Sequence, residues 1–302
     1  MQTYFIRHTQ KQDIDDDTRE RLWKSRKIAV HFPHEKSGRK NTDTTSLNPE
    51  DYKVSDRKAI RALLELAANG GYVCAQYHGH YGEVLVGRIE PRTKVELLRG
   101  KWGDLHGLKG RTAILKALPL RNAKVVRTVD YPVMFVGQPR QGTLMRWHVI
   151  GAAVQNIIEG RKETFSFASL MPAHQEILCS EFLRLPEAAG WRLPTLAHLI
   201  LPLGRTMKDI DIFGLATDGK RILAQVTFAN REKSIWKLKK LNTYANVDCH
   251  LIMFCQTDNQ EFIGRVHIVP IEKVFDFFRS FETGRKWRQM VAGSPSEGSI
   301  SP

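Results

Sequence analysis

The residues best suited to chemistry lie in one stretch, 208–228, which reads KDIDIFGLATDGKRILAQVTF. Asp211 stands in its first half and Gln225 in its second, and the pair Asp218-Gly219 between them is a strong signal for a hairpin turn. Hydrolysis of a phosphodiester needs a divalent ion that neutralises the phosphate and activates water. Because Mg²⁺ prefers carboxylate and carbonyl oxygens, the pattern predicts a metal site. Asp211 supplies a carboxylate to it, Gln225 an amide oxygen, and the preceding helix a glutamate.

The length of the hairpin loop decides which residues face one another. A two-residue loop places Asp211 opposite Val226, whereas a three-residue loop (217–219, with Gly219 left-handed) places Asp211 opposite Gln225. A slip of one residue moves every side chain to the other face, and the apolar pattern favours the longer loop. The apolar face then contains Ile210, Ile212, Ile222, Ala224, Val226 and Phe228, and the polar corner contains Asp209, Asp211, Gln225 and Thr227. A polar corner on a buried hairpin requires a partner or a function.

The letters DID followed by QVT resemble the motif of the PD-(D/E)xK nuclease superfamily, and glutamine in the acidic position is similar to the Mrr-type restriction nucleases. The segment QEILCSEFLR resembles the leading helix of that group, and the resemblance covers roughly residues 168–270. It implies cleavage of DNA with Mg²⁺ or Mn²⁺ held by Asp211, Gln225 and Glu176. Glu181 is the alternative to Glu176, and Asp209 is a further carboxylate beside the site.

The sequence departs from this family at Thr227, which stands where the motif has a lysine and cannot supply a cation. Some members of the superfamily carry the lysine on a neighbouring element, and the basic segment 231–246 follows directly. Lys233 and Lys237 are therefore the expected substitutes. In the alternative interpretation these lysines form a solvated face or bind the DNA backbone. The chain would then be an inactive protein of nuclease fold that binds DNA or RNA.

Two segments of the N-terminal half, RLWKSRKIAVHFP and GGYVCAQYHGHYGEVLVGRIEP, resemble the PUA-like group, which includes the EVE and YTH modules. Members of that group are small barrels that hold a modified base in an aromatic-lined pocket, and a flipped base stacks well on aromatic rings. The resemblance implies a reader of DNA, including DNA with modified bases, with RNA as the second choice. The candidate pocket residues are Trp23, Tyr77, Tyr81, Trp102 and Trp147. The alternative is that each is an ordinary core or surface aromatic.

Local patterns predict the elements that would position these residues. The N-terminal half reads as short strands at 27–32, 72–78, 83–91, 112–120 and 123–129, with one helix before Gly70 that Ser55 can cap. The C-terminal half reads as a helix at 169–185, the hairpin, a helix at 231–246, strands at 248–256 and 265–270, and a last helix at 271–282. This second order is typical of a mixed sheet with helices packed on it.

The length of 302 residues favours two domains. We expect a PUA-like module at 1–155, a linker at 156–167, a restriction-endonuclease-like domain at 168–290 and a disordered tail at 291–302. The fold class is α/β (α+β): a β-barrel module followed by a mixed sheet flanked by helices. Together the two resemblances imply modification-dependent (type IV-like) restriction, or defence against phage. Many nucleases of this group dimerise to cut both strands, so the resemblance also implies a homodimer.

The composition agrees with a polyanionic partner. The net charge is +14, and so basic a chain is attracted to nucleic acid or to anionic surfaces. No stretch is apolar for long enough to cross a bilayer, and the first residues lack the pattern of a signal peptide. The four cysteines show no CxxC spacing and read as reduced thiols. We therefore expect a cytoplasmic protein without a membrane partner.

Overall fold

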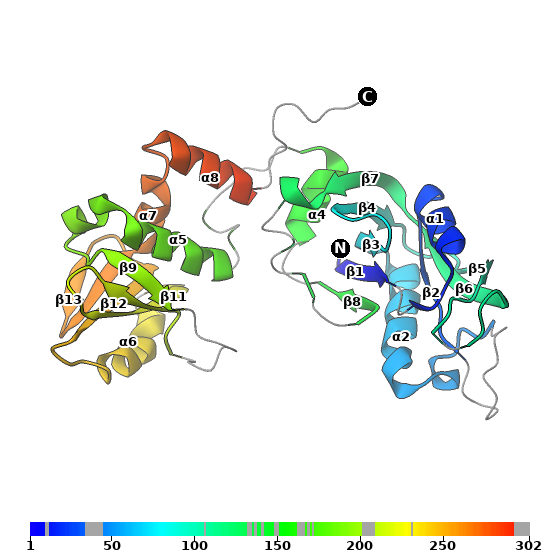
Figure 1. Cartoon of the computed structure of the whole chain (residues 1–302), viewed down its shortest axis with the longest axis horizontal. Helices are drawn as coiled ribbons and strands as arrows, with labels where there is room; N and C mark the ends of the chain where they lie inside the picture. The colour runs from blue at the N-terminus through cyan, green and yellow to red at the C-terminus, as the bar shows by residue number, and fades with distance from the viewer. Residues whose placement is uncertain are drawn as a thin grey trace. The chain divides into compact units, whose positions relative to one another are not determined.

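The computed structural model describes two compact units. The described residues are 1–9, 12–33, 45–105, 107–131, 135, 138–139, 142–147, 151–161, 167, 170, 172–200, 209–230 and 232–292. The first unit contains Met1–Thr164 and Met290–Pro302, and the second contains Phe165–Gln289 (Figure 1). Both units mix helices and strands, so the predicted α/β class is confirmed at this level.

The first unit contains two sheets. Its strands are β1 (Thr3–His8), β2 (Lys27–Val30), β3 (Gly71–Tyr77), β4 (Glu83–Ile89), β5 (Glu96–Lys101), β6 (Thr112–Pro119), β7 (Arg121–Arg127) and β8 (Leu144–Arg146). Five strands form one sheet in the order β7-β4-β3-β1-β8, and three form the other in the order β2-β6-β5. Among the strand pairs that the structure describes in this unit, only β1 with β3 is parallel.

The predicted barrel is not closed. Strands β6 and β7 follow one another almost directly, yet β6 pairs within the three-stranded sheet and β7 lies at an edge of the five-stranded sheet. Among the described residues, no strand pairing joins the edges of the two sheets. The chain passes from one sheet to the other at Leu120, whose amide donates to the Arg26 carbonyl at 2.8 Å. The apolar alternation of these strands is therefore satisfied by two packed sheets rather than by one closed sheet.

The described α-helices that accompany these sheets are α1 (Asp16–Lys24), α2 (Val54–Asn69) and α4 (Gly151–Glu159). Helix α2 buries one apolar face, because Ile60 and Leu63 are fully buried. Gly70 ends the helix in a positive-φ conformation and donates its amide to the Leu66 carbonyl at 2.9 Å. The predicted Ser55 cap is wrong: the helix begins earlier, with Lys53 at the N-cap and no side-chain cap.

His8, at the end of β1, is a buried neutral histidine. Its Nε2 accepts from the Ala29 amide at 3.0 Å, its Nδ1 lies 3.3 Å from the Gln76 carbonyl oxygen, and the Tyr77 ring stacks on it. Burial, followed by the nearby charge of Arg19, lowers the pKa of His8 to about 3. The unfolded chain therefore binds a proton at His8 in the range between this value and 6.5, while the folded chain does not.

We expect this difference to destabilise the protein in acid. The free energy of unfolding should fall by about 1.4 kcal/mol for each pH unit below 6.5 on account of His8 alone. Urea unfolding at pH 6.5 and pH 5.0, compared between the natural chain and His8→Gln, isolates this contribution from those of the carboxylates. Equal pH slopes in the two proteins would contradict the buried neutral state of His8.

The second unit is built on one mixed sheet. Its elements are α5 (Pro172–Arg184), β9 (Leu196–Ile200), β10 (Ile212–Ala216), β11 (Arg221–Asn230), α6 (Ile235–Asn242), β12 (Cys249–Gln256), β13 (Glu261–Ile263), β14 (Val266–Pro270), α7 (Ile271–Phe277) and α8 (Glu282–Ala292). The strand order is β13-β14-β12-β11-β10-β9. Strands β9, β10 and β11 are antiparallel, and β11, β12 and β14 are parallel. Strand β9 was not predicted.

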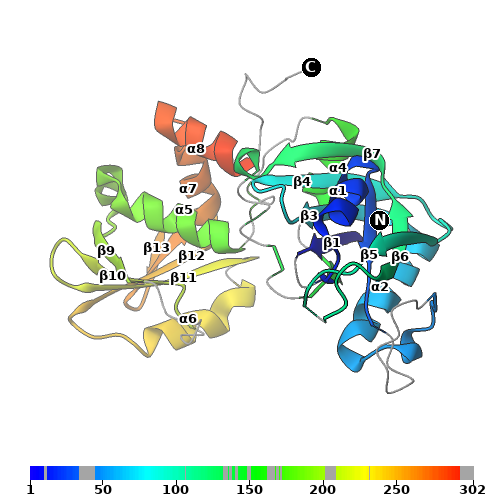
Figure 2. The same cartoon turned by 45° about the vertical axis from the view of Figure 1, so that its right-hand side comes forward.

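Helices cover both faces of this sheet. Helices α5 and α7 lie on one face and α6 lies on the other, in both views (Figures 1 and 2). The predicted helix at 169–185 corresponds to α5, whose Leu178, Cys179, Phe182 and Leu183 are all fully buried. On the opposite face, Leu241 of α6 joins a core with Leu223, Leu251 and Met253. The hairpin of β10 and β11 is therefore buried on both sides.

The segment between the units differs from the prediction. Helix α4 continues to Glu159 inside the predicted linker. At its other end, Phe167 is buried against the rings of Phe228 and Phe275 in the second unit, with centroids 5.1 and 5.7 Å away. The first residues of the predicted tail end α8, and residues 293–302 lie outside the described residues. Among the described residues, no helix is long and apolar enough to span a bilayer.

Candidate functional site

The hairpin of β10 and β11 has the three-residue loop that the apolar pattern predicts. Ile212 pairs with Ala224, and Leu215 pairs with Arg221. The Ala216 amide donates to the Lys220 carbonyl at 2.8 Å and closes the loop at residues 217–219. Gly219 has a φ of 82°, the left-handed conformation that such a loop requires at its last residue. The predicted register is confirmed.

The ladder becomes irregular at the candidate site. The Asp211 amide donates to the Ala224 carbonyl at 2.9 Å although Ala224 is already the ladder partner of Ile212, so two residues oppose one, as in a β-bulge. The extra residue turns Ile210 to the α6 face, where it packs with Leu223. The prediction that Ile210 shares a face with Ile212 is therefore wrong. Phe228, predicted on the same apolar face, remains 40% exposed.

Asp211 is the centre of the polar corner. Its Oδ2 accepts hydrogen bonds from Gln225 Nε2 and from the Val226 amide, the latter at 2.8 Å. Burial raises the pKa of the Asp211 carboxyl, and the Val226 amide, the charge of Lys237 and the Gln225 amide oppose this increase. Gln225 itself is buried. The structure thus brings Asp211 and Gln225 together as predicted and holds the carboxylate in one orientation.

Helix α5 carries Glu176, whose charge acts on the same buried thiol as the charge of Asp211. Burial, then Asp211, then Glu176 raise the pKa of the Cys179 thiol, so both carboxylates act on one buried sulfur. Glu181 follows Glu176 by five positions, which turns its side chain well away around the helix. Of the two predicted glutamates, Glu176 is therefore the one that shares its surroundings with Asp211.

Lys237 is the lysine that the structure relates to Asp211, because its charge lowers the pKa of that carboxyl. Lys233 is exposed in a 3-10 turn, Glu232–Ser234, and its amide donates to Asn230 Oδ1 at 3.0 Å. Lys240, which was not singled out from the sequence, donates to Asp209 Oδ1 at 2.8 Å. Asp209 is thus engaged in an ion pair beside the corner.

Thr227 is buried, and its Oγ1 accepts from the Ala229 amide at 3.3 Å. This local bond coincides with a shift in the β11–β12 pairing between Val226 and Asn230. Thr227 therefore shapes the end of β11 and supplies no cation, whereas the charge of Lys237 acts on Asp211. Among the described residues, no three His, Cys, Asp or Glu side chains form a group that could hold a metal by themselves.

Four of the five predicted pocket aromatics belong to the core of the first unit. Trp23 packs edge-on against Tyr77 with ring centroids 5.3 Å apart, and the Tyr77 hydroxyl donates to the Lys27 carbonyl at 2.6 Å. Trp102 is 1% exposed beside His31, and Trp147 is buried against Phe5. These four side chains are at most 8% exposed, so in this structure they do not line an open pocket for a base, contrary to the prediction.

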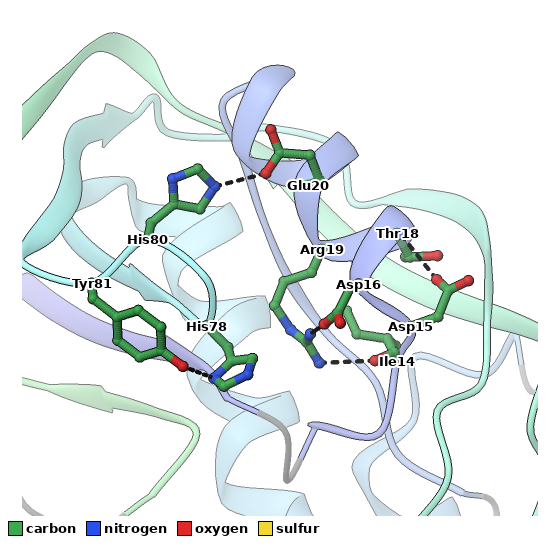
Figure 3. Close-up of polar contacts among 9 residues, drawn as sticks. All are labelled: Ile14, Asp15, Asp16, Thr18, Arg19, Glu20, His78, His80 and Tyr81. Atoms are coloured by element: carbon green, nitrogen blue, oxygen red, sulfur yellow. Dashed lines mark hydrogen bonds and ion pairs between the residues drawn. The ribbon is translucent and has the colours of Figure 1, made fainter.

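Tyr81 is the exception, with 79% of its surface exposed on the turn between β3 and β4. Its hydroxyl lies 3.3 Å from His78 Nδ1, whereas His80 turns to α1, stacks on Trp23 and lies 2.7 Å from Glu20 (Figure 3). The two histidines of this turn therefore have separate partners. The structure does not bring Tyr81 together with Trp102 or Trp147 in one pocket.

The core role of Trp102 leads to a prediction. Trp102→Ala should lower the free energy of unfolding by about 3–5 kcal/mol, because a large buried ring leaves a cavity. Tyr81→Ala should change it by less than about 0.5 kcal/mol, since the side chain is exposed. Chemical unfolding of both variants measures the contrast. A Trp102→Ala variant of natural stability that lost DNA binding would restore Trp102 as a pocket residue.

A hollow of about 270 Å³ lies elsewhere in the second unit, lined by Trp191, Arg192, Phe262 and His267 among others, and it contains no predicted site residue. Searches among protein-family models, curated proteins and solved structures found no match to the chain.

Proposed function

We propose that the second unit is a metal-dependent DNA endonuclease and that the first unit binds the DNA. The observation that carries this proposal is the Asp211 carboxylate. It is held in place by Gln225 and the Val226 amide, despite burial that raises its pKa. Burial of a carboxylate lowers the stability of the fold. A role of this carboxylate in phosphodiester hydrolysis accounts for its presence there.

The residues at this corner fit Mg²⁺ or Mn²⁺. Asp211 Oδ1 accepts no hydrogen bond from any residue that the structure describes, and Glu176 shares its surroundings. A half-turn of the Gln225 amide would present its oxygen in place of its nitrogen. Carboxylate and amide oxygens suit these hard cations, so Asp211, Glu176 and Gln225 would hold the ion. When bound, it supplies charge neutralisation of the phosphate and a more acidic water.

The protein side chains supply position and charge. The Val226 amide orients the Asp211 carboxylate whether or not Gln225 turns to the ion, so this carboxylate keeps its position when substrate arrives. Lys237 places a positive charge near that carboxylate, where the phosphate that is cut would also lie. Its charge can stabilise the developing negative charge and orient the attacking water, the role that Thr227 cannot fill.

The biological role belongs to the same proposal. The basic composition supports DNA as the partner. The two resemblances support modification-dependent restriction in the cytoplasm by a homodimer that cuts both strands. A modified-base pocket would have to use residues other than the four buried aromatics. The rival function is an inactive DNA- or RNA-binding protein. Thr227 at the lysine position and the lack of a three-ligand group among the described residues favour it.

One experiment separates the two. The full chain is incubated with plain and base-modified duplex DNAs in the presence of Mg²⁺, Mn²⁺ or a chelator, beside the Asp211→Ala variant. We expect cleavage that requires the metal and Asp211. If the natural chain binds the DNAs of the panel but cuts none of them, the chain is an inactive DNA-binding protein.

A further inference from the structure

Helix α6 presents a large aromatic side chain to solvent. Trp236 is 55% exposed, whereas Leu241 of the same helix is fully buried in the sheet core. The two residues are five positions apart and so point to different sides of the helix. The sheet core is therefore built without Trp236, and the indole faces solvent with two lysine cations over its ring. A tryptophan among lysines is visible in the sequence, but its exposure is not.

Two lysines connect this ring to the candidate site. The Nζ atoms of Lys237 and Lys240 lie 5.7 and 5.3 Å from the Trp236 ring centroid. The same Lys240 donates to Asp209 at 2.8 Å, and the charge of the same Lys237 lowers the pKa of Asp211. Trp236 therefore stands beside the polar corner that contains Asp209 and Asp211, and we place phosphodiester hydrolysis at Asp211.

The charge around Trp236 identifies the class of partner. Residues 232–242 contain four lysines and only one acidic residue, Glu232. An apolar protein surface would have to desolvate these cations, whereas a phosphate backbone neutralises them and releases its counterions. Proteins that bind single-stranded nucleic acid combine aromatic rings, on which bases stack, with cations that bind the phosphates. An exposed indole between lysines provides both.

We propose that Trp236 stacks on an unpaired base of the DNA bound at the Asp211 corner, with Lys237 and Lys240 on the adjoining phosphates. The bases of an intact duplex are stacked on one another and offer no free face to an indole. The substrate class is therefore DNA with an unpaired, flipped or terminal base beside the phosphate that is cut. This inference rests on the proposed nuclease function for its location, but it is tested by binding alone.

The experiment measures binding of the full chain without divalent metal, so the DNA stays intact. Three DNAs are compared: a perfect duplex, the same duplex with one bulged 2-aminopurine, and the single strand. The fluorescence of 2-aminopurine is quenched when the base stacks on an aromatic ring. For the natural chain we expect quenching and tighter binding of the bulged DNA than of the perfect duplex.

The variants isolate the ring. Trp236→Leu keeps apolar bulk and should weaken binding of the bulged DNA roughly tenfold, the effect of one lost base–aromatic stack, and should abolish the quenching. Binding of the perfect duplex should stay within about twofold. Trp236→Phe should retain part of both signals. Ile235→Ala is the matched control, because Ile235 is also exposed, at 48%, and has no aromatic ring.

Circular dichroism checks that each variant is folded. If Trp236→Leu does not fold, Trp236→Phe is used in its place. Equal losses on bulged and perfect DNA, or no loss on either, would overturn the inference, as would quenching that survives Trp236→Leu. Unchanged binding of the bulged DNA by Trp236→Leu, beside metal-dependent cleavage that needs Asp211, would retain the nuclease and remove this inference. If binding of the bulged DNA needs Trp236 but no metal-dependent cleavage is found, base stacking on Trp236 is supported and the nuclease function is refuted.

Discussion

Asp211→Asn is expected to reduce metal-dependent DNA cleavage about a thousandfold or more, to the background of the assay. The change removes the buried charge that we assign to the metal and keeps the shape of the side chain. A metal ion contributes several kcal/mol to stabilising the charge of the transition state, and each 1.36 kcal/mol is a factor of ten in rate. Single-turnover cleavage of a labelled DNA in Mg²⁺ and in Mn²⁺ measures the loss.

Asp209→Asn is the matched control, because Asp209 precedes Asp211 by two residues and pairs with Lys240 at 2.8 Å. It should retain cleavage within about tenfold. Loss of activity in Asp209→Asn together with full activity in Asp211→Asn would assign the metal site to Asp209 instead of Asp211. Equal activity of both variants and the natural chain would refute the proposed centre.

The stability of Asp211→Asn provides a second readout. Folding raises the pKa of the Asp211 carboxyl, so the folded chain holds this proton more tightly than the unfolded chain, and ionisation costs stability as pH rises through the raised value. Asp211→Asn should therefore melt at a higher temperature than the natural chain at pH 7. The gain should shrink as pH falls and Asp211 becomes protonated. A lower melting temperature at pH 7 would indicate a structural role for the carboxylate.

Lys237→Met is expected to reduce cleavage about a hundredfold, the scale found when one preorganised donor is removed from a transition state. Methionine keeps an unbranched apolar stem along the helix and loses the charge. Because Lys237 lowers the pKa of Asp211, the acid limb of the pH–rate profile should also move to higher pH. Single-turnover rates between pH 5 and pH 9 measure both effects.

Lys233→Met is the matched control, since Lys233 is exposed in the turn before α6 and shows no effect on Asp211. It should change cleavage by less than about fivefold and leave the pH profile in place. If Lys233→Met has the larger effect, the substitute lysine comes from the turn. If neither variant affects the rate, these lysines only bind the DNA backbone, and the salt dependence of binding should then become less steep in both.

Much of the second unit follows from local sequence. The apolar alternation and the Asp-Gly turn determine the register of β10 and β11, because a one-residue slip would expose a buried face. The inner face of α5 follows from the helical spacing of Leu178, Cys179 and Phe182. In the first unit, strand β1 was not predicted. It pairs with β3, which lies about seventy residues away in the sequence, and the local pattern of residues 3–8 does not indicate that partner.

Only the tertiary structure decided which polar groups meet. Asp211, Glu176 and Lys237 come from a strand end and from helices on opposite faces of the sheet, so their mutual effects depend on packing rather than spacing. The bulge that redirects Ile210 is one extra residue in the ladder, which a strict period of two cannot predict. The same holds for the aromatics. Sequence identifies Trp102 and Trp236 as large apolar rings, but burial is a property of the whole fold, which covers the first and exposes the second.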